Sequence, residues 1–327
     1  MASNAASLAS GVIFGSALTL SNVAAPSVII NQLKFTDYHM LLTFLTASAC
    51  STVVFAAAKR AGLVHIACKK DNSYGWLGRY DGNIVGGALM GAGMGLTGAC
   101  PGTVLVQAAL GVSGSRALLL SGLLGGIAFV KWNQRNKQLA ADKSAKHSVS
   151  EATGLRDSNT MLVLEAALWS MILAANAFAP RGHYLVHPVV GGVLIGLAQV
   201  SSVAFVKRPI GVSTAYEDLG KFFWSCVEGK PPAPGVENMI FVGGLVAGAK
   251  LVAYAVPEIL ESFSPERSIS FPAALVGGFA LIFGARLAGG CTSGHGLSGM
   301  ASMGISSFIS VPSMFAGGIL AAMLSRA

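Results

Sequence analysis

The chain has 327 residues, of which 53% are hydrophobic and 11% are charged, and its formal net charge is +8. The charged fraction is well below the roughly 25% of soluble globular domains, which argues against an ordinary soluble enzyme or binding domain. The basic residues lie in loops and form no stripe interleaved with aromatic residues, so we expect no nucleic-acid partner. The composition predicts an all-α polytopic membrane protein embedded in a lipid bilayer.

Apolar runs long enough to cross about 30 Å of hydrocarbon recur along the whole chain. The first residues, "MASNAASLASGVIFG", contain no basic region before the apolar run, so we expect no signal peptide. We expect about nine transmembrane helices, near residues 7–27, 39–58, 83–100, 116–132, 160–178, 188–206, 237–255, 272–290 and 310–325.

A polar segment at 133–159 divides the chain. It is rich in charged residues and lacks apolar periodicity, so it predicts a solvated linker. We therefore expect one integral membrane domain made of a first half (1–132), this linker and a second half (160–327).

The two halves carry similar motifs in the same order. "GVIFGSALTLSNV", which begins at Gly11, corresponds to "GVLIGLAQVSSVA", which begins at Gly192. Further along, Gly87 precedes Cys100 by the same spacing with which Gly278 precedes Cys291. If each half has four spans and one helix stands between them, the second half enters the membrane from the opposite side. The sequence thus predicts two inverted pseudo-repeats with broken or re-entrant segments.

The distribution of basic residues predicts the orientation, because Lys and Arg concentrate in short cytoplasmic loops. With the N-terminus inside, the inner loops 59–81, 131–159 and 207–236 hold most of the 22 Lys and Arg residues. The outer segments hold Lys34, Arg116, Arg181, Arg267 and Arg326. We expect a cytoplasmic N-terminus, in the plasma membrane or another cell membrane.

The stretch "GLTGACPGT" at residues 95–103 places a cysteine directly after an apolar run. Pro101 lacks an N–H and favours the first turn of a helix. We therefore expect one helix to stop at Cys100 and another to restart with free amides at Gly102 and Thr103.

The stretch "LAGGCTSGHGLSG" at residues 287–299 has the same character. Its glycines permit sharp turns around Cys291, and Thr292 and Ser293 are good caps for a restarted helix. Helix starts attract anions. A thiol is a weak donor and a soft neighbour, so it suits a sulfur-bearing anion better than phosphate.

Arg286 and His295 flank the second motif, and each has two interpretations. Arg286 lies in an apolar run, where an unpaired guanidinium is costly. It either attracts the anion at a vestibule or extends to the inner headgroups. His295 either donates a hydrogen bond beside the pathway or has a structural role. Cys100, Cys291 and His295 could also hold a metal, but a zinc site needs a fourth ligand, so we expect no metal and no cofactor.

Both motifs resemble the signature segments of the YeeE/YedE family of sulfur transport membrane proteins. The resemblance rests on "GMGLTGACPGT" and "GARLAGGCTSGHGLSG" and is strongest over 86–115 and 276–306. It implies an hourglass-shaped helical protein in which thiosulfate passes between cysteine thiols, with Cys100 and Cys291 as the relay thiols. Bacterial members usually carry a further cysteine in the first repeat, where this chain has Ala24, Ala25 and Pro26. Cys50, in the next span, is a candidate substitute.

We expect a membrane permease that takes up a small inorganic sulfur anion, above all thiosulfate, and not an enzyme. The chain lacks a GxxxxGK[ST] motif, so its own ATP hydrolysis does not drive transport. The alternatives are a membrane sulfurtransferase carrying persulfide on Cys100 or Cys291, a transporter of a related sulfur or selenium species, and a structural or regulatory membrane protein. A soluble sulfurtransferase is a candidate partner. The predicted substrate-binding residues are Cys100, Cys291, Pro101, Gly102, Thr103, Thr292, Ser293, His295 and Arg286.

Overall fold

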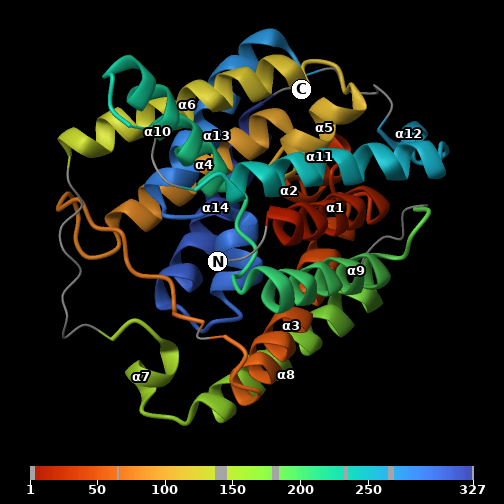
Figure 1. The fold of residues 1–327 in the computed structure, drawn as a ribbon. Coiled ribbons are helices and arrows are strands. Elements are labelled where there is room, and N and C mark those ends of the chain that lie inside the picture. Colours follow the sequence, from red (N-terminus) through yellow and green to blue (C-terminus); the bar gives the residue numbers. More distant parts are fainter. Residues whose placement is uncertain are drawn as a thin grey trace.

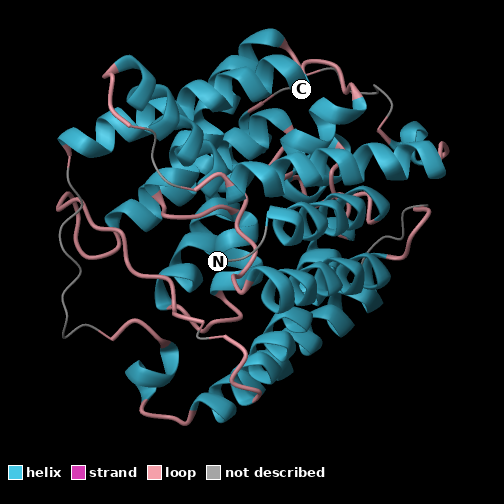
Figure 2. Ribbon diagram, viewed as in Figure 1, coloured by secondary structure: helices cyan, strands magenta, loops and turns pink. Residues whose placement is uncertain are grey.

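A computed structural model describes residues 4–64, 66–136, 146–178, 184–231, 235–263 and 269–325 of the chain. These residues form helices joined by loops, without a β-strand among them (Figure 2). An isolated antiparallel bridge joins Ser148 to Gly304. The predicted all-α class is confirmed.

The two halves of the chain repeat the same order of long and short helices (Figure 1). The first half contains α1 (Asn4–Leu20), α2 (Pro26–Leu33), α3 (His39–Arg60), α4 (Asp81–Thr97), α5 (Thr103–Leu110) and α6 (Ser115–Arg135). The second contains α9 (Pro188–Ser201) with the π-helical turn η1 (Ser202–Val206), then α10 (Ser213–Val227), α11 (Glu237–Ala255), α13 (Phe271–Leu287), the π-helical η2 (Thr292–Gly299) and α14 (Ile305–Leu324). The remaining helices are α7 (Val149–Thr153), α8 (Asp157–Phe178) and α12 (Ile259–Ser262).

Helix packing follows this repeat. α1 packs against α11 as α9 packs against α3, and α4 packs against α14 as α13 packs against α6. The equivalent helices α4 and α13 also pack against each other. A Cβ placed on Gly86 would lie 2.3 Å from the Ala288 nitrogen, whereas one on Gly93 would lie 2.6 Å from the Gly277 oxygen. Residue numbers therefore rise along α4 as they fall along α13, and the two repeats are inverted.

The predicted number of spans requires correction. Within the described residues, six helices are long and apolar enough to cross a membrane: α3, α6, α8, α9 with η1, α11 and α14. A seventh is reached if α13 and η2, bent by 40° at their junction, form one broken span. The predicted spans 7–27 and 83–100 are instead α1 and α4, each of 17 residues. They end early because Asn22 (φ 59°) and Gly98 (φ 62°) adopt left-handed backbone conformations that a helix cannot continue.

Part of the predicted linker is folded. α6 continues to Arg135, and residues 137–145 lie outside the described residues. Beyond them, Ile305 N donates to the His147 carbonyl at 3.0 Å, and Ser148 forms a capping box with Glu151 at the start of α7. The end of the segment is thus attached to the turn between η2 and α14.

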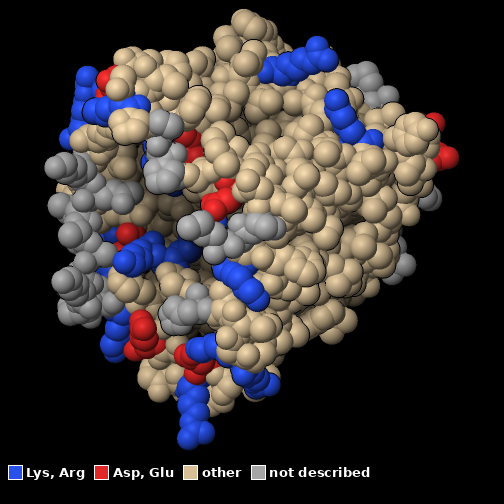
Figure 3. Space-filling model, in the orientation of Figure 1, with Lys and Arg blue, Asp and Glu red and all other residues tan. Residues whose placement is uncertain are grey.

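The three loops predicted to be cytoplasmic meet on one side of the molecule. Lys59 pairs with Asp157, and Lys131 Nζ lies 2.7 Å from Glu228 Oε1. Arg79 Nη2 donates to the Lys146 carbonyl at 2.8 Å. Figure 3 shows Lys and Arg side chains gathered toward the left and lower edges, whereas a broad area to the right carries few. The basic loops therefore form one surface, as their shared predicted location requires.

α8 lies at the edge of the molecule and packs mainly against α3 (Figure 1). Large apolar side chains on it are exposed, among them Leu162, Val163 and Leu173. An exposed apolar helix of 22 residues suits contact with lipid rather than with water. The predicted helix between the two halves is therefore a peripheral span that leaves the centre to the repeats.

Candidate functional site

The first cysteine turn is held by bonds among its own residues. After Gly98 ends α4, the Cys100 amide donates to Thr103 Oγ1 at 2.7 Å. The Cys100 carbonyl accepts from Val104 N at 3.0 Å. The helix therefore stops and restarts as predicted, but the Thr103 amide, expected to be free, donates to Cys100 Sγ at 3.4 Å.

The second cysteine turn is held by side chains from other parts of the chain. Three successive carbonyls at the end of α13, those of Leu287, Ala288 and Gly289, accept hydrogen bonds from Asn72 (3.2 Å), Asn83 (3.0 Å) and Lys69 (2.9 Å) respectively. Carbonyls at a helix end inside a protein need such partners. Because the three donor residues belong to the segment around the start of α4, that segment fixes where α13 ends.

The Cys291 thiol is enclosed by polar groups and has no exposed surface. Its sulfur lies 3.2 Å from Ser293 Oγ, and the Ser213 hydroxyl and the Gly294 amide also bond to it. Arg286 Nη1 in turn donates to Ser213 Oγ at 3.3 Å. The thiol is thus connected through one hydroxyl to a guanidinium.

His295 has a structural place in the turn. Its Nε2 lies 3.0 Å from the Ala288 carbonyl and its Nδ1 lies 2.9 Å from Ser307 Oγ. A carbonyl only accepts, so Nε2 carries the proton and Nδ1 accepts from the hydroxyl. Both ring nitrogens are occupied, which supports the structural interpretation of His295.

Arg286 is compensated inside the protein. Its guanidinium pairs with Glu217 of α10, and 12% of its side chain is exposed. Glu217 also accepts from Lys221 Nζ at 2.6 Å. Arg286 therefore has a carboxylate partner inside the protein, and it contacts the surroundings of the cysteine turn through Ser213.

A small cavity, called here the central cavity, brings the two cysteine turns together. Cys100, Gly102 and Thr103 line it from one side, and Thr292 and Ser293 line it from the other. The rest of the lining is mostly apolar and comes from α1, α3, α9, Val23 and Leu297, and the volume is about 50 Å³. That is room for one or two water molecules, so the cavity is nearly closed.

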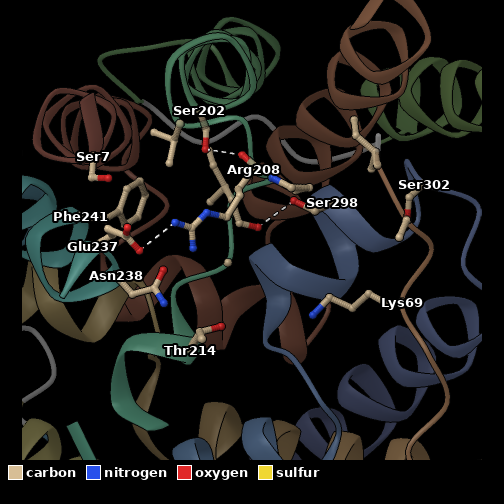
Figure 4. Close-up of a pocket in the computed structure, with 16 residues that line it drawn as sticks. Ser7, Lys69, Ser202, Arg208, Thr214, Glu237, Asn238, Phe241, Ser298 and Ser302 are labelled. Atoms are coloured by element: carbon tan, nitrogen blue, oxygen red, sulfur yellow. Dashed lines mark hydrogen bonds and ion pairs between the residues drawn. The ribbon is translucent and has the colours of Figure 1, made fainter. Parts of the chain in front are cut away.

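A larger cavity of about 300 Å³, called here the basic cavity, lies on the side of the basic loops (Figure 4). Lys69 reaches it from the segment between α3 and α4, and Arg208 reaches it from the segment after η1. Arg208 Nη2 lies 2.8 Å from Glu237 Oε2. Sequence reasoning missed this cavity and both cations, although it had noted the charge of their loops.

η2 and the start of α10 separate the two cavities. Thr292 and Ser293 face the central cavity, whereas Ser298 and Ser302 face the basic cavity. The Val212 amide, at the start of α10, donates to Ser293 Oγ at 3.5 Å. We call the segments 210–214 and 291–298 the septum, and Cys291 lies within it.

Tyr216 of α10 links the septum to the first cysteine turn. Its hydroxyl donates to the Pro101 carbonyl at 2.8 Å. It also interacts electrostatically with both Cys100 and Cys291. Sequence reasoning missed the part played by α10, although the repeat pairs it with α2, which follows the first break. That correspondence was the available signal.

Cys100 lines the central cavity, whereas Cys291 and the remaining cysteines line neither cavity. Cys50 packs at the α3–α9 contact, where a Cβ on Gly196 would lie 3.2 Å from its sulfur. Cys68 Sγ donates to the Ser302 carbonyl at 2.8 Å, and Cys226 is exposed. In the first-repeat break, which has no cysteine, Val23 lines the central cavity.

The described residues contain no group of three or more His, Cys, Asp or Glu side chains arranged to hold a metal ion.

Comparison with known proteins identifies similar sequences. Residues 20–320 match a protein family described as sulphur transport. The chain is 24% identical over 317 residues to the thiosulfate transporter TsuA of Spirochaeta thermophila, covering 91% of this chain and 92% of that relative. Two proteins named probable transporters, from two strains of Xylella fastidiosa, are 34% and 32% identical over 116 residues, covering 35% of this chain and 76% of each relative.

Proposed function

The chain belongs to the sulphur transport family, and we propose that it is a permease that takes up thiosulfate through the central cavity and the septum, along the thiols of Cys100 and Cys291. The observation that carries this proposal is that both cysteine turns, far apart in the sequence, meet at one cavity. The similarity to a thiosulfate transporter along almost the whole chain supports the substrate.

The electrostatics of the turns suit an anion. The N-termini of α5, α10 and η2 lie together, because Val212 contacts both the Gly102 position and Ser293. Each helix start carries a partial positive charge. Arg286 and Lys69 lie behind the second turn. A small dianion at the turns therefore meets positive potential. Because no full cation contacts it at Cys100, the anion is bound weakly there and can move on to Cys291.

The thiols suit the sulfur end of thiosulfate. The terminal sulfur of this anion is large, polarisable and negatively charged, and an S–H group is a weak donor to it. Weak binding at successive positions favours passage over retention. In this mechanism the anion moves from the Cys100 thiol to the Cys291 thiol with no covalent bond made or broken. The central cavity is too small for a five-atom anion, so passage requires the septum to move.

The proposed orientation places the basic cavity on the cytoplasmic side, because the basic loops surround it. Uptake then runs from the Cys100 turn, past Cys291, to the basic cavity. A soluble sulfurtransferase is the proposed acceptor of thiosulfate on that side.

The test is uptake of thiosulfate labelled differently on its two sulfur atoms, by the full-length protein in proteoliposomes. A permease delivers both labels to the lumen in equal amounts and leaves no label on the protein. Label from the outer sulfur bound to the protein, with sulfite released, would instead show a sulfurtransferase. Absence of any protein-dependent flux of sulfur would refute both functions.

A further inference from the structure

Among the described residues, Lys69 has no carboxylate within ion-pair distance, although Glu237 lines the same cavity. Within the described residues, none of its contacts is an ion pair, and its ammonium donates to the Gly289 carbonyl at 2.9 Å. Arg208, the other cation of the basic cavity, is neutralised by Glu237. Lys69 is half-buried, and a cation that is partly withdrawn from water without an ion-pair partner is costly, so such a group usually has a partner.

The surroundings of Lys69 increase this cost. A Cβ on Gly290 would lie 2.6 Å from Lys69 Nζ, and one on Gly294 would lie 3.3 Å from it, so the ammonium is packed against the cysteine turn. Burial and the positive charge of Arg286 together lower the pKa of Lys69 to about 8, although Cys291 acts in the opposite direction. A negative charge arriving at this point would relieve the cost.

The basic cavity has the room and the donors for such a charge. Its volume of about 300 Å³ holds a five-atom anion together with several waters. Thr214 lines it together with Lys69, and Figure 4 shows Lys69 extending into the same space. Ser298 and Ser302 also line it, but their hydroxyls donate to the carbonyls of Ile210 at 2.7 Å and Gly299 at 2.9 Å. Ammonium and hydroxyl groups are strong donors that suit oxyanion oxygens, whereas the thiols of the two turns suit sulfur.

We propose that Lys69, with the Thr214 hydroxyl, forms a second binding station for a divalent sulfur oxyanion in the basic cavity, on the far side of the septum from the central cavity. This inference rests on the proposed function and adds a residue to it. The anion leaves the Cys291 thiol and is received by the Lys69 ammonium through its oxygen atoms. The oxygen-bearing end of thiosulfate resembles sulfate, so the station also binds sulfate. The thiols distinguish the two anions, because only thiosulfate has a terminal sulfur.

The test compares neighbouring lysines in the full-length protein. Lys69→Gln removes the ammonium, Lys69→Arg keeps a charge, and Lys70→Gln is the matched control because Lys70 is exposed. In proteoliposomes at low salt we expect thiosulfate uptake to fall at least tenfold in Lys69→Gln, to stay within about threefold in Lys69→Arg and to be unchanged in Lys70→Gln. Added sulfate on the side of the basic cavity should inhibit the wild type and not Lys69→Gln. Equal uptake by Lys69→Gln and the wild type would overturn the proposal.

A second pair of variants leaves Lys69 in place. Ala67 is exposed and lines the basic cavity, so Ala67→Glu adds a repulsive charge and Ala67→Lys an attractive one without disturbing the core. We expect sulfate inhibition to weaken in the first and to strengthen in the second, each by about threefold or more. Identical inhibition in both would overturn the station even if Lys69→Gln failed to fold. Wild-type protein that carries no thiosulfate would refute the proposed function instead, so the two failures are distinguishable.

Discussion

The two cysteine turns occupy equivalent positions in the inverted repeats, yet they are built differently. The Cys100 turn is neutral and is closed by Thr103, which bonds to both the backbone and the thiol of Cys100. The Cys291 turn is held by partners from distant segments, one of which, Lys69, carries charge, and the nearby guanidinium of Arg286 bonds to Ser213 beside the turn. The two repeats therefore place a thiol at the same position, but the groups around Cys100 are neutral whereas those around Cys291 include charged side chains.

This difference gives the proposed passage a direction of increasing polarity. Cys100 retains 8% exposure at the apolar central cavity, whereas Cys291 is fully enclosed in the septum. Beyond the septum lies the larger basic cavity. On the proposed path, an anion would exchange soft contacts for the Lys69 ammonium and the Thr214 hydroxyl as it proceeds.

Removing either thiol tests whether both turns serve one path. We expect Cys100→Ala and Cys291→Ala each to abolish thiosulfate uptake, because each removes one contact from a series that the anion must pass. Uptake of radiolabelled thiosulfate, normalised to the amount of protein in the membrane, measures the effect. Cys226→Ala, on the exposed face of α10, should transport like the wild type. Normal uptake in either of the first two variants would contradict the series arrangement.

The Arg286–Glu217 pair tests the charged support of the second turn. Glu217→Gln leaves a largely buried guanidinium without its carboxylate, which should lower the free energy of unfolding by about 3–5 kcal/mol. Thermal unfolding of the protein in lipid nanodiscs measures the loss. Glu228→Gln, at a more exposed ion pair with Lys131, is the matched control and should shift the melting temperature far less. Similar shifts in both variants would show that the buried pair has no special role.

Gln107 tests the neutral support of the first turn. Its Nε2 donates to the carbonyls of Ala24 and Gly98, both at 2.9 Å, and so ties the two breaks of the first repeat together. Gln107→Leu should cost about 1–3 kcal/mol, because it leaves two buried carbonyls without a donor. The same substitution at exposed Gln134 controls for the change in polarity. A stable Gln107→Leu protein with full uptake would show that the first turn needs no such tie.

The sequence predicted those features that depend on local pattern. Pro101 and the glycines around Cys291 marked both breaks, the matched motifs predicted the repeat, and the single helix expected between the two halves predicted its inversion. The number of spans was wrong because hydropathy does not register a single left-handed residue such as Asn22 within an apolar run. Contacts made by side chains far apart in the chain, such as Glu217 with Arg286, carry no local signal. Lys69 was overlooked for the same reason, since in the sequence it differs little from Lys70.

The pH dependence of sulfate inhibition tests the role of the Lys69 ammonium while both thiols stay in place. With its pKa lowered to about 8 by burial and by Arg286, the ammonium is protonated in about nine-tenths of molecules at pH 7 and in about one-tenth at pH 9. Sulfate inhibition should therefore weaken several-fold as the pH rises through 8. Bound sulfate favours the protonated form, so the midpoint should move upward as the sulfate concentration increases.

The groups facing Lys69 are Arg286, Cys291 and His295, and Arg208 and Glu237 line the same cavity. Arginine keeps its charge over this range, so Lys69→Arg should show no such decline. If sulfate inhibition declined equally with pH in Lys69→Arg, another of these groups would be the one that titrates. Lys69 would then not be the group that makes the Cys291 side charged.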